Sequence, residues 1–397
     1  MKWRMFICAI CFLIGGCSLN IPLEDQFSDP DAITDVLSAR SLLASAYKAM
    51  PQQIFQLSVL SDDFCPSQHL NKDMSLQGLY NWREVEMTEL AGTLWAGYYA
   101  VIAEVNALLA RIDAVVTLDE TEKLEKMRIV CEAKALKSWC YFDLLRLFAP
   151  RYEGNENKDG IILKKRVELD FLPRSSVKEC VTEIRTLLNE ARNVDNTQKN
   201  VYWLSDKAVA YLQVELELYA GNYPAVLELT KDLETEYPES VLGADVYKYL
   251  WSSENSDARI FGKYQLEQIY MDIRFDTFEK GDYLVLSQNV DYEEEDIRKE
   301  WSEIPFVMPD AKNVRLLGKY NKMNRDKVAS KYVNVARAAG MWLMRVEALA
   351  RSGKEGDAVA LANRMLKQRG ATEWSTNIAG NELISKILIE RQKEYVF

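Results

Sequence analysis

Apolar residues recur every three or four positions over several long stretches of the chain. This spacing places them along one stripe of a helix, which is typical of an amphipathic helix packed against a core. The stretches with this spacing are 32–50, 89–113 and 121–148. A further helix is expected from Ser176 to about residue 193, because Ser176 and Glu179 have the spacing of a capping box. The pattern predicts long helices through the first half of the chain.

Two later parts of the chain predict helical hairpins. The paired stretches are 206–220 with 223–237, and 336–352 with 357–368. Each pair turns at a glycine, Gly221 or Gly353, and an Ala-Val pair opens the helix that follows. This arrangement is similar to that of tetratricopeptide helix pairs. We therefore expect a mainly α fold, built as a tetratricopeptide-like array of helical hairpins.

Helical spacing fades in two segments, at about 52–88 and about 241–334. The second segment contains short runs typical of strands, at 283–286, 306–308 and 314–317. Irregular segments of this length are usually functional or disordered. We expect one domain over residues 32–397, in which the helical array occupies 32–240 and 335–397. The two irregular segments are then loop-rich insertions with a few short strands.

The N-terminus has the features of an export signal. Lys2 and Arg4 precede an apolar run from Met5 to Ile14. That run is too short to span a bilayer, which needs about 20 residues, but it has the length and flanks of a signal peptide. We expect residues 1–16 to be removed as a signal peptide.

Cys17 stands where this signal ends. The tetrad Ile14-Gly15-Gly16-Cys17 is similar to a bacterial lipobox, in which the cysteine is acylated and the chain is cut just before it. We expect Cys17 to carry a lipid and residues 17–31 to form a tether. The alternative is that Cys17 is an ordinary residue near the cleavage site of a soluble secreted protein.

The mature chain is acidic. Removing Lys2 and Arg4 with the signal leaves 60 acidic residues against 47 basic ones, a net charge of −13. An acidic surface repels phosphate backbones, and no Lys- and Arg-rich tract interleaved with aromatic residues occurs in the sequence. These features argue against nucleic acid as a partner.

Candidate catalytic chemistry is scarce. The chain has one histidine, His69, which lies in a polar stretch and is expected in a surface loop. A zinc site with several histidine ligands cannot be built, and no nucleotide-binding or nucleophile-elbow motif is present. Paired carboxylates are a weak signal, because 60 acidic residues always offer pairs. We expect no catalytic residue, no cofactor and no metal.

Four cysteines follow the N-terminal segment, and the sequence leaves their disulfide state open, although a bond between Cys131 and Cys140 is not expected. They are Cys65, Cys131, Cys140 and Cys180. None has the CxxC spacing of a metal or redox site. Cys131 and Cys140 lie on one predicted helix about half a turn out of phase, so they should face opposite ways. We expect all four to be small buried side chains.

A series of motifs follows in order along the chain. The helix predicted at 89–113 carries Trp95, Tyr98 or Tyr99, Ile102 and Asn106, and the next carries EAKALKS followed by YFDLLRLF. Later come RSSVKE, DIR and KY, and the final segments are LMRVEALARSG, LANRMLKQRG and ILIERQKEYVF. In this order, over about 300 residues, the chain resembles the SusD/RagB family of outer-membrane nutrient-binding lipoproteins.

The resemblance implies a non-catalytic protein, anchored by lipid in the outer membrane and facing the cell surface. Members of this family cap a SusC-like TonB-dependent transporter and hand over oligosaccharides or, in some members, peptides. Two alternatives stay open for this chain. One is a peptide-capturing subunit of the same architecture, and the other is a lipid-anchored helical adaptor that faces the periplasm and binds no small ligand.

Aromatic side chains in the irregular segments are the candidate ligand contacts. Sugars present flat C–H faces that stack on indole and phenol rings, while polar side chains bond their hydroxyls. The resemblance implies a ligand face built from such insertions. The candidates are Tyr80, Trp82, Trp251, Tyr292 and Trp301, with Asp62 and Asp63 as polar partners. The alternative for each ring is to anchor a loop on the core.

Other prominent residues are expected to be structural because they lie on the predicted amphipathic helices. Trp95, Trp139, Tyr141 and Trp342 are assigned to the core. Glu132 and Asp143 suggest acid–base chemistry at first sight, but salt bridges and inter-helix hydrogen bonds are the commoner use of a charge in this position.

Overall fold

The computed structural model describes most of the chain after residue 32. The described ranges are 33–66, 74–168, 171–192, 200–252, 254–264, 284–308, 311–320 and 332–396. The expected signal peptide at 1–16, Cys17 and the tether at 17–31 lie outside these ranges, as does His69.

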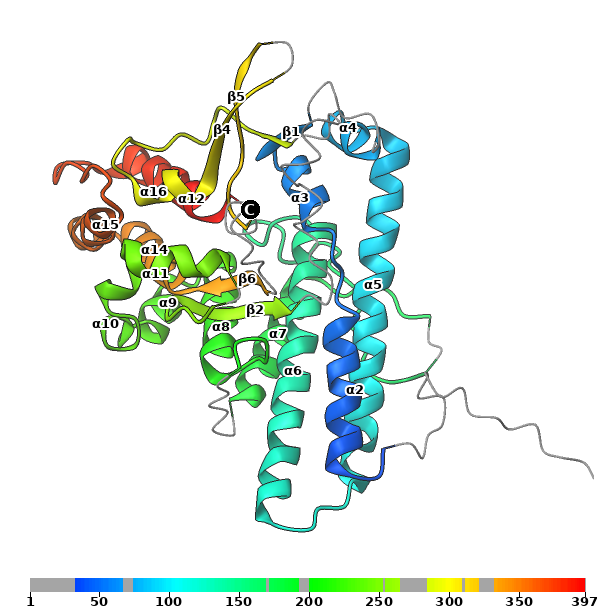
Figure 1. Cartoon of the computed structure of the whole chain (residues 1–397). Helices are drawn as coiled ribbons and strands as arrows, with labels where there is room; N and C mark the ends of the chain where they lie inside the picture. Colours follow the sequence, from blue (N-terminus) through cyan, green and yellow to red (C-terminus); the bar gives the residue numbers. More distant parts are fainter. Residues whose placement is uncertain are drawn as a thin grey trace, which may run out of the picture.

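Long helices form one side of the molecule (Figure 1). They are α2 (Val36–Lys48), α5 (Glu84–Arg111) and α6 (Glu120–Phe148), and they pack side by side. Asp35 and Asp119 cap α2 and α6 by accepting bonds from backbone N–H groups in the first turn, Ser38 N at 2.7 Å and Glu122 N at 2.8 Å. The three helices predicted by spacing are confirmed, although α5 begins five residues earlier than expected.

Helix α5 is long and apolar enough, by length and composition, to cross a membrane over Glu84–Ala114. Core helices of soluble proteins pass the same test. Here α5 packs against α2, α4 and α6, and 39% of its most apolar window is buried.

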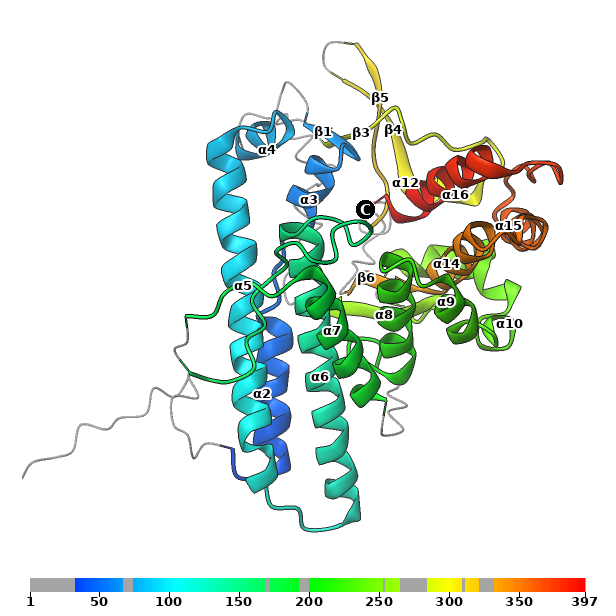
Figure 2. The same ribbon diagram turned by 180° about the vertical axis from the view of Figure 1, so that it is seen from behind.

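Helix α7 (Val177–Ala191) begins with the predicted capping box. Ser176 Oγ accepts from Glu179 N at 3.2 Å, and Glu179 Oε2 accepts from Ser176 N at 2.8 Å. The connection between α6 and α7 crosses α5 (Figure 2). It is held there by Tyr99 Oη and Asn106 Nδ2, which donate to the backbone carbonyls of Ile162 and Lys164.

The two predicted hairpins are present. They consist of α8 (Asp206–Tyr219) with α9 (Tyr223–Leu229), and of α14 (Ala338–Arg351) with α15 (Glu355–Arg369), and α16 (Gly380–Tyr395) follows. Gly221 and Gly353 have φ of 69° and 75°, so the turns use the left-handed conformation that glycine adopts without strain. Helix α14 packs against all four of the others.

The helix expected at 223–237 is broken, and this prediction was wrong. It divides into α9 and α10 (Leu233–Glu236). Arg345 of α14 explains the break, because its guanidinium donates to Leu227 O, Thr230 O and Thr230 Oγ1, each at 3.0 Å. The carbonyls at the end of α9 are therefore satisfied by a distant side chain instead of by continuation of the helix.

Two small sheets are built from strands that lie between the hairpins in the sequence, except for one strand that comes from the first insertion. The first has the order β1 (Phe64–Pro66), β3 (Leu284–Leu286), β5 (Asn313–Leu317), β4 (Glu303–Val307), and the second pairs β2 (Arg259–Tyr264) with β6 (Tyr332–Arg337). All pairs are antiparallel. The three strand runs predicted by sequence correspond to β3, β4 and β5. Short helices complete this region: η2 (Glu239–Leu242), α11 (Ala244–Tyr247), η3 (Lys248–Trp251) and α12 (Ile297–Ser302). One more, η1 (Ile112–Ala114), follows α5 earlier in the chain.

The first insertion, expected to be irregular over 52–88, is more regular than predicted. It contains α3 (Ile54–Leu60), β1, α4 (Met74–Tyr80) and the start of α5. The elements are only three to seven residues long. A run this short has too few positions to show a period, so the sequence pattern missed them.

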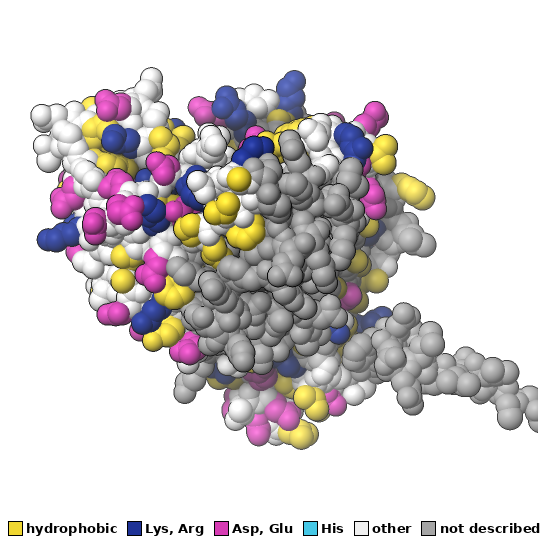
Figure 3. Space-filling view, turned by 45° about the horizontal axis from the view of Figure 1, so that its top comes forward, with side chains coloured by type: hydrophobic (Ala, Val, Ile, Leu, Met, Phe, Trp, Pro, Cys, Tyr) yellow, Lys and Arg dark blue, Asp and Glu magenta, His cyan; other side chains and the backbone are white. Residues whose placement is uncertain are grey.

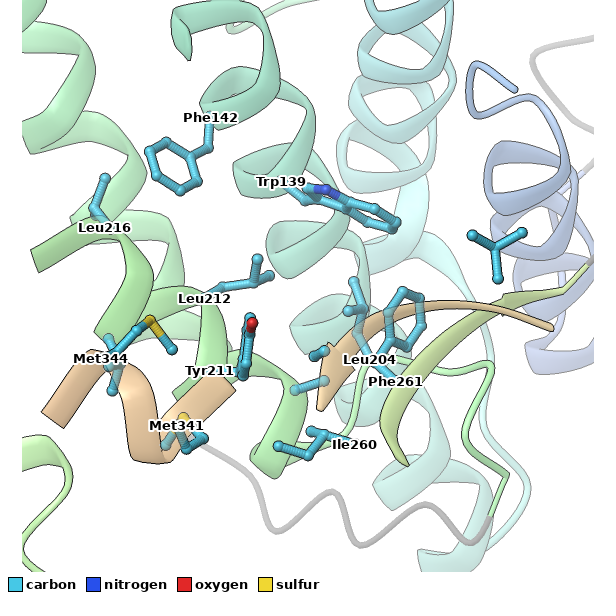
Figure 4. Close-up of a cluster of buried hydrophobic side chains, with 14 of the residues drawn as sticks. Trp139, Phe142, Leu204, Tyr211, Leu212, Leu216, Ile260, Phe261, Met341 and Met344 are labelled. Carbon is cyan, nitrogen blue, oxygen red and sulfur yellow. The ribbon is translucent and has the colours of Figure 1, made fainter. Parts of the chain in front are cut away.

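One hydrophobic core joins the early and late parts of the array (Figure 4). Trp139 of α6 packs edge-on against Phe261 of β2, with ring centroids 5.3 Å apart. Tyr211 and Leu212 of α8 and Met341 of α14 extend the cluster. Burial of each such large side chain contributes about 1.5–3 kcal/mol. The mainly α fold expected from the sequence is confirmed.

Candidate ligand-binding site

The turn between α3 and β1 lies near the top of the molecule in Figure 1, beside α4. Asp62 has φ of 61°, in the left-handed region that aspartate tolerates better than most residues. The carbonyl of the next residue, Asp63, accepts from Ser287 N at 2.9 Å, which fixes the turn against the end of β3. We call Asp62, Cys65, Tyr80 and Trp82 the corner.

Tyr80, the last residue of α4, reaches back to β1. Cys65 Sγ donates to Tyr80 Oη at 3.2 Å. The neighbouring Cys65, with smaller contributions from burial and from Asp62, raises the pKa of the Tyr80 phenol. The phenol is protonated at neutral pH, and its O–H can donate to a ligand oxygen.

Trp82 presents its indole to solvent, with 63% of the side chain exposed. Its φ is 55°, a conformation that costs a bulky L-residue about 1–2 kcal/mol. The turn is nevertheless fixed, because Trp82 N donates to Leu79 O at 3.0 Å and Arg83 N donates to Gly78 O at 2.9 Å. Strain of this kind persists where the surrounding structure imposes it, and it is concentrated at functional sites.

Asp63 faces away from the corner. Burial raises the pKa of its carboxyl group, while Ser61, Lys319 and Gln392 act in the opposite direction. Ser61 Oγ donates to Asp63 Oδ2 at 3.0 Å. Asp63 therefore lies near Gln392 of α16 and near Lys319, whereas its neighbour Asp62 is exposed. Of the two predicted polar contacts, only Asp62 is placed to meet a ligand beside Tyr80.

Trp251 and Tyr292 lie in the interior, contrary to the expected ligand contacts. Trp251 is fully buried, and its ring meets Tyr320 edge-on at 5.2 Å, with Lys319 Nζ 4.7 Å above it. Tyr292 is 4% exposed and donates to Lys393 O at 2.8 Å. Both rings serve the alternative role of anchoring their segment on the core.

Trp301 is half-buried in α12, where it packs against the core. Helix α12 leads directly into β4, which is the opposite edge of the sheet from β1. The structure therefore does not bring Trp301 to the corner.

Most residues assigned to structural roles have those roles. Trp139, Tyr141 and Trp342 are buried, and Trp95 is half-buried against the core. Glu132 pairs with Arg40 at 3.0 Å, and Asp143 accepts from Tyr98 Oη at 2.9 Å and pairs with Arg146. The four described cysteines are free. Cys131, Cys140 and Cys180 are buried as predicted, whereas Cys65 is only half-buried.

Cys65 is the corner residue that sequence reasoning missed. Its partner Tyr80 is fifteen residues away on a different element, and no local pattern signals a thiol–phenol contact. The left-handed turn at Trp82 likewise has no sequence signal, because turns of this kind usually use Gly or Asn.

A hollow of about 780 Å³ lies away from the corner, at the start of α7. It is lined by Leu163, Lys165, Leu172, Pro173 and neighbouring polar residues of α7, with no aromatic side chain among them. It therefore offers no stacking surface for a sugar ring, and the corner is the better candidate. Among the described residues, no group of three His, Cys, Asp or Glu side chains is placed to hold a metal ion.

The fold is similar to those of solved SusD proteins. A putative sugar binding protein from Bacteroides vulgatus has a TM-score of 0.75 at 21% identity, over 92% of this chain and 85% of that one. A SusD superfamily protein from Bacteroides thetaiotaomicron has 0.72 at 18%, over 91% and 86%. A SusD-like carbohydrate binding protein from Bacteroides vulgatus has 0.70 at 18%, over 91% and 81%. No curated protein matches the chain.

The sequence itself gives a family match. Residues 23–214 match the model of a SusD-like family described as starch-binding and associating with the outer membrane. This match and the shared architecture agree with the ordered motifs of the sequence. Residues 23–214 are therefore similar to this SusD-like family, and the whole described fold is similar to that of solved SusD proteins.

Proposed function

We propose that this protein is a non-catalytic nutrient-binding lipoprotein of the outer membrane, which captures oligosaccharides at the cell surface and delivers them to a SusC-like TonB-dependent transporter. The observation that carries the proposal is the exposed indole of Trp82, which stands in a strained turn two residues after Tyr80, whose phenol lies near Asp62. The family description and the sugar-binding relative support an oligosaccharide as the ligand.

The corner has the chemistry that a sugar requires. An indole face stacks on the C–H face of a pyranose, and a phenol and a carboxylate bond its hydroxyl groups. The turn that carries the ring is already held by backbone hydrogen bonds, so its backbone loses little conformational entropy on binding. Neither contact needs a titrating group, which fits a protein that binds without reacting.

Calorimetric titration with starch oligosaccharides and a glycan panel tests this proposal. We expect Trp82→Ala to lower the affinity at least tenfold and Trp82→Tyr to recover part of it. Phe171→Ala is the matched control, since Phe171 is fully exposed on the connection between α6 and α7. Equal affinity of the Trp82→Ala variant and the unaltered protein would remove the corner as the binding site.

A peptide ligand is the second candidate, because β1 is an edge strand that pairs only with β3 among the described strands. Peptides often bind by adding a strand to such an edge. However, β1 has three residues and ends in Pro66, which has no backbone N–H to offer. We therefore place this candidate second. An empty glycan panel, together with peptides that co-purify with the protein, would favour it.

The anchor and its orientation are tested in cells. We expect Cys17→Ser to release the protein from the membrane fraction, and continued membrane association would contradict lipidation at Cys17. Protease treatment of intact cells should digest a surface-facing protein. Protection from the protease would favour the periplasm-facing adaptor instead. Co-purification of the transporter with the tagged full-length protein tests the delivery step.

No nucleic-acid partner is proposed. On the face shown in Figure 3, acidic, basic and hydrophobic side chains are interspersed over the described part. That part shows no continuous basic tract of the kind that tracks a phosphate backbone.

A further inference from the structure

Helix α4 ends in a Schellman motif with an unusual choice of residues. Arg83 N donates to Gly78 O at 2.9 Å and Trp82 N donates to Leu79 O at 3.0 Å, which are the two backbone bonds that define this motif. The residue in the left-handed conformation is usually glycine. Here it is Trp82, with φ of 55°, and the glycine stands earlier, at Gly78. The turn therefore carries strain that a glycine at position 82 would avoid.

Gly78 supplies space and not backbone freedom. It is buried in α4, and it is not among the glycines with positive φ. A Cβ atom at this position would lie 2.7 Å from Arg83 Nη2 and still closer to the carboxyl group of Glu86, so both side chains lie directly against the glycine. A glycine within a helix is less favourable than an alanine. The close contact with Arg83 and Glu86 gives a physical reason for its presence.

Arg83 and Glu86 form an ion pair over this glycine. The side chain of Arg83 is 53% exposed, whereas that of Glu86 is 17% exposed. Glu86 lies in the first turn of α5, where the helix dipole favours a negative charge. In many Schellman motifs an apolar contact joins the two positions that Gly78 and Arg83 occupy here. The ion pair takes the place of that contact, and we call Gly78, Arg83 and Glu86 the clamp.

The clamp encloses part of the corner. Tyr80 and Trp82 lie on the short stretch of chain between Gly78 and Arg83, where α4 leads into α5 at the top of the molecule (Figure 1). The position of both rings therefore depends on how the two ends of this stretch are held together.

We propose that the clamp positions the Trp82 indole for the ligand, with Arg83 and Glu86 as positioning residues that hold the strained turn. Strain at a single residue persists where the surrounding contacts impose it, and the clamp and the two backbone bonds supply such contacts here. The proposal rests on the proposed function, because it takes Trp82 as a ligand contact. It adds that disturbing the clamp weakens binding even when every group of the corner is retained.

Gly78→Ala tests the clamp without removing any polar or aromatic group. The added methyl group must displace the ends of the Arg83 and Glu86 side chains, while alanine itself favours the helix. The matched control is Gly92→Ala, on α5, where an added Cβ atom meets open space. In calorimetric titration with maltoheptaose we expect Gly78→Ala to lower the affinity about fivefold, because the indole is less well preorganised. Gly92→Ala should leave the affinity unchanged.

Hydrogen exchange of the Trp82 and Arg83 amides, measured by mass spectrometry on the full-length protein, needs no ligand. These amides donate the two backbone bonds of the turn, so their exchange rates report how firmly it is held. We expect Gly78→Ala and Glu86→Ala to speed their exchange about tenfold. The control Glu89→Ala, at an exposed position of α5, should leave it unchanged. In an Arg83→Ala/Glu86→Ala background, Gly78→Ala should have no further effect, because the groups that it displaces are absent.

Two outcomes overturn the proposal. One is unchanged exchange at both amides in Gly78→Ala. The other is faster exchange in Gly78→Ala with unchanged affinity, in a protein whose affinity Trp82→Ala does lower. A failure of the proposed function is distinguishable from both, since it appears as equal affinity of Trp82→Ala and the unaltered protein while Gly78→Ala still speeds the exchange.

Discussion

Cys65 Sγ donates a hydrogen bond to Tyr80 Oη over 3.2 Å, and this contact joins β1 to the last residue of α4. The thiol uses an acceptor site of the phenol and leaves the phenol proton free. Cys65 therefore positions Tyr80, which we propose contacts the ligand.

Tyr80→Phe should lower glycan affinity about tenfold, because a hydrogen bond to a ligand hydroxyl contributes about 1.4 kcal/mol. Calorimetric titration measures the effect. The control is Cys65→Ala, which keeps the phenol and should change affinity less than threefold. If the two variants lose affinity equally, Tyr80 acts through the position of the turn and not through a contact with the ligand.

Trp82→Asn should separate stability from binding. Asparagine tolerates the left-handed conformation, so we expect it to raise the free energy of unfolding by about 1 kcal/mol relative to Trp82→Ala, which keeps the strain. Both variants lose the indole and should lose glycan binding. Urea denaturation measures the difference between them. Equal stability of the two variants would show that the turn at residue 82 is not strained.

We expect the packing of α16 against the rest of the protein to depend more on Glu394 than on any other carboxylate. It is fully buried, and burial alone would raise its pKa, but Arg369, Arg337, Arg298 and Lys319 prevail and lower the pKa to about 2. Arg369 Nη2 lies 3.1 Å from Glu394 Oε1. Glu394→Gln leaves these cations without this negative charge and should destabilise the protein by about 3–5 kcal/mol.

The pH dependence of stability checks this role of Glu394. A carboxylate with a lowered folded-state pKa stabilises the protein fully above its unfolded value near 4.5, and this contribution is lost as the pH falls toward 2. Thermal melts should show that slope in the unaltered protein and a smaller one in Glu394→Gln. The control is Glu382→Gln, at an exposed position of α16, and it should keep the full slope.

Lys137 should make stability depend on pH in the alkaline range. It is 4% exposed, donates to Asn106 Oδ1 at 2.6 Å, and burial lowers its pKa to about 8. The cost of burying the charged amine is complete below pH 8 and disappears as the pH rises toward 10.5, so this group makes stability increase over that range. Lys137→Met should remove the increase, which is on the order of 2 kcal/mol.

Urea denaturation at pH 7.5 and 9.5 measures the contribution of Lys137. Lys134→Met is the control on the same helix, where Lys134 is half-buried and pairs with Glu190 at 2.7 Å. It should retain the increase seen in the unaltered protein. An identical increase in Lys137→Met would show that the Lys137 amine is as well solvated in the folded state as in the unfolded chain.

Local signals in the sequence were sufficient to predict the long helices and the capping box at the start of α7. The Ser176 and Glu179 pair predicted the start of α7 because a capping box is made by residues three positions apart. The break between α9 and α10 was not predictable in this way. It depends on Arg345, more than a hundred residues further along the chain.

In the candidate site too, some features were predictable from local sequence and others depended on distant residues. Sequence position alone placed Trp82 and Trp251 in the same class, as aromatic residues of irregular segments. The structure separates them, since Trp82 is 63% exposed and Trp251 is fully buried beneath Tyr320 and Lys319. The burial of a ring in a loop depends on which distant segments fold over it.

By itself the sequence determined the helical array, its turns and the acidic balance of charge, because helix period and turn chemistry depend on residues a few positions apart. The tertiary structure decided which aromatic rings face solvent, which carboxylates are buried among arginines, and how Tyr80 meets Cys65. These features depend on contacts between segments far apart in the chain, which no local pattern of residues encodes.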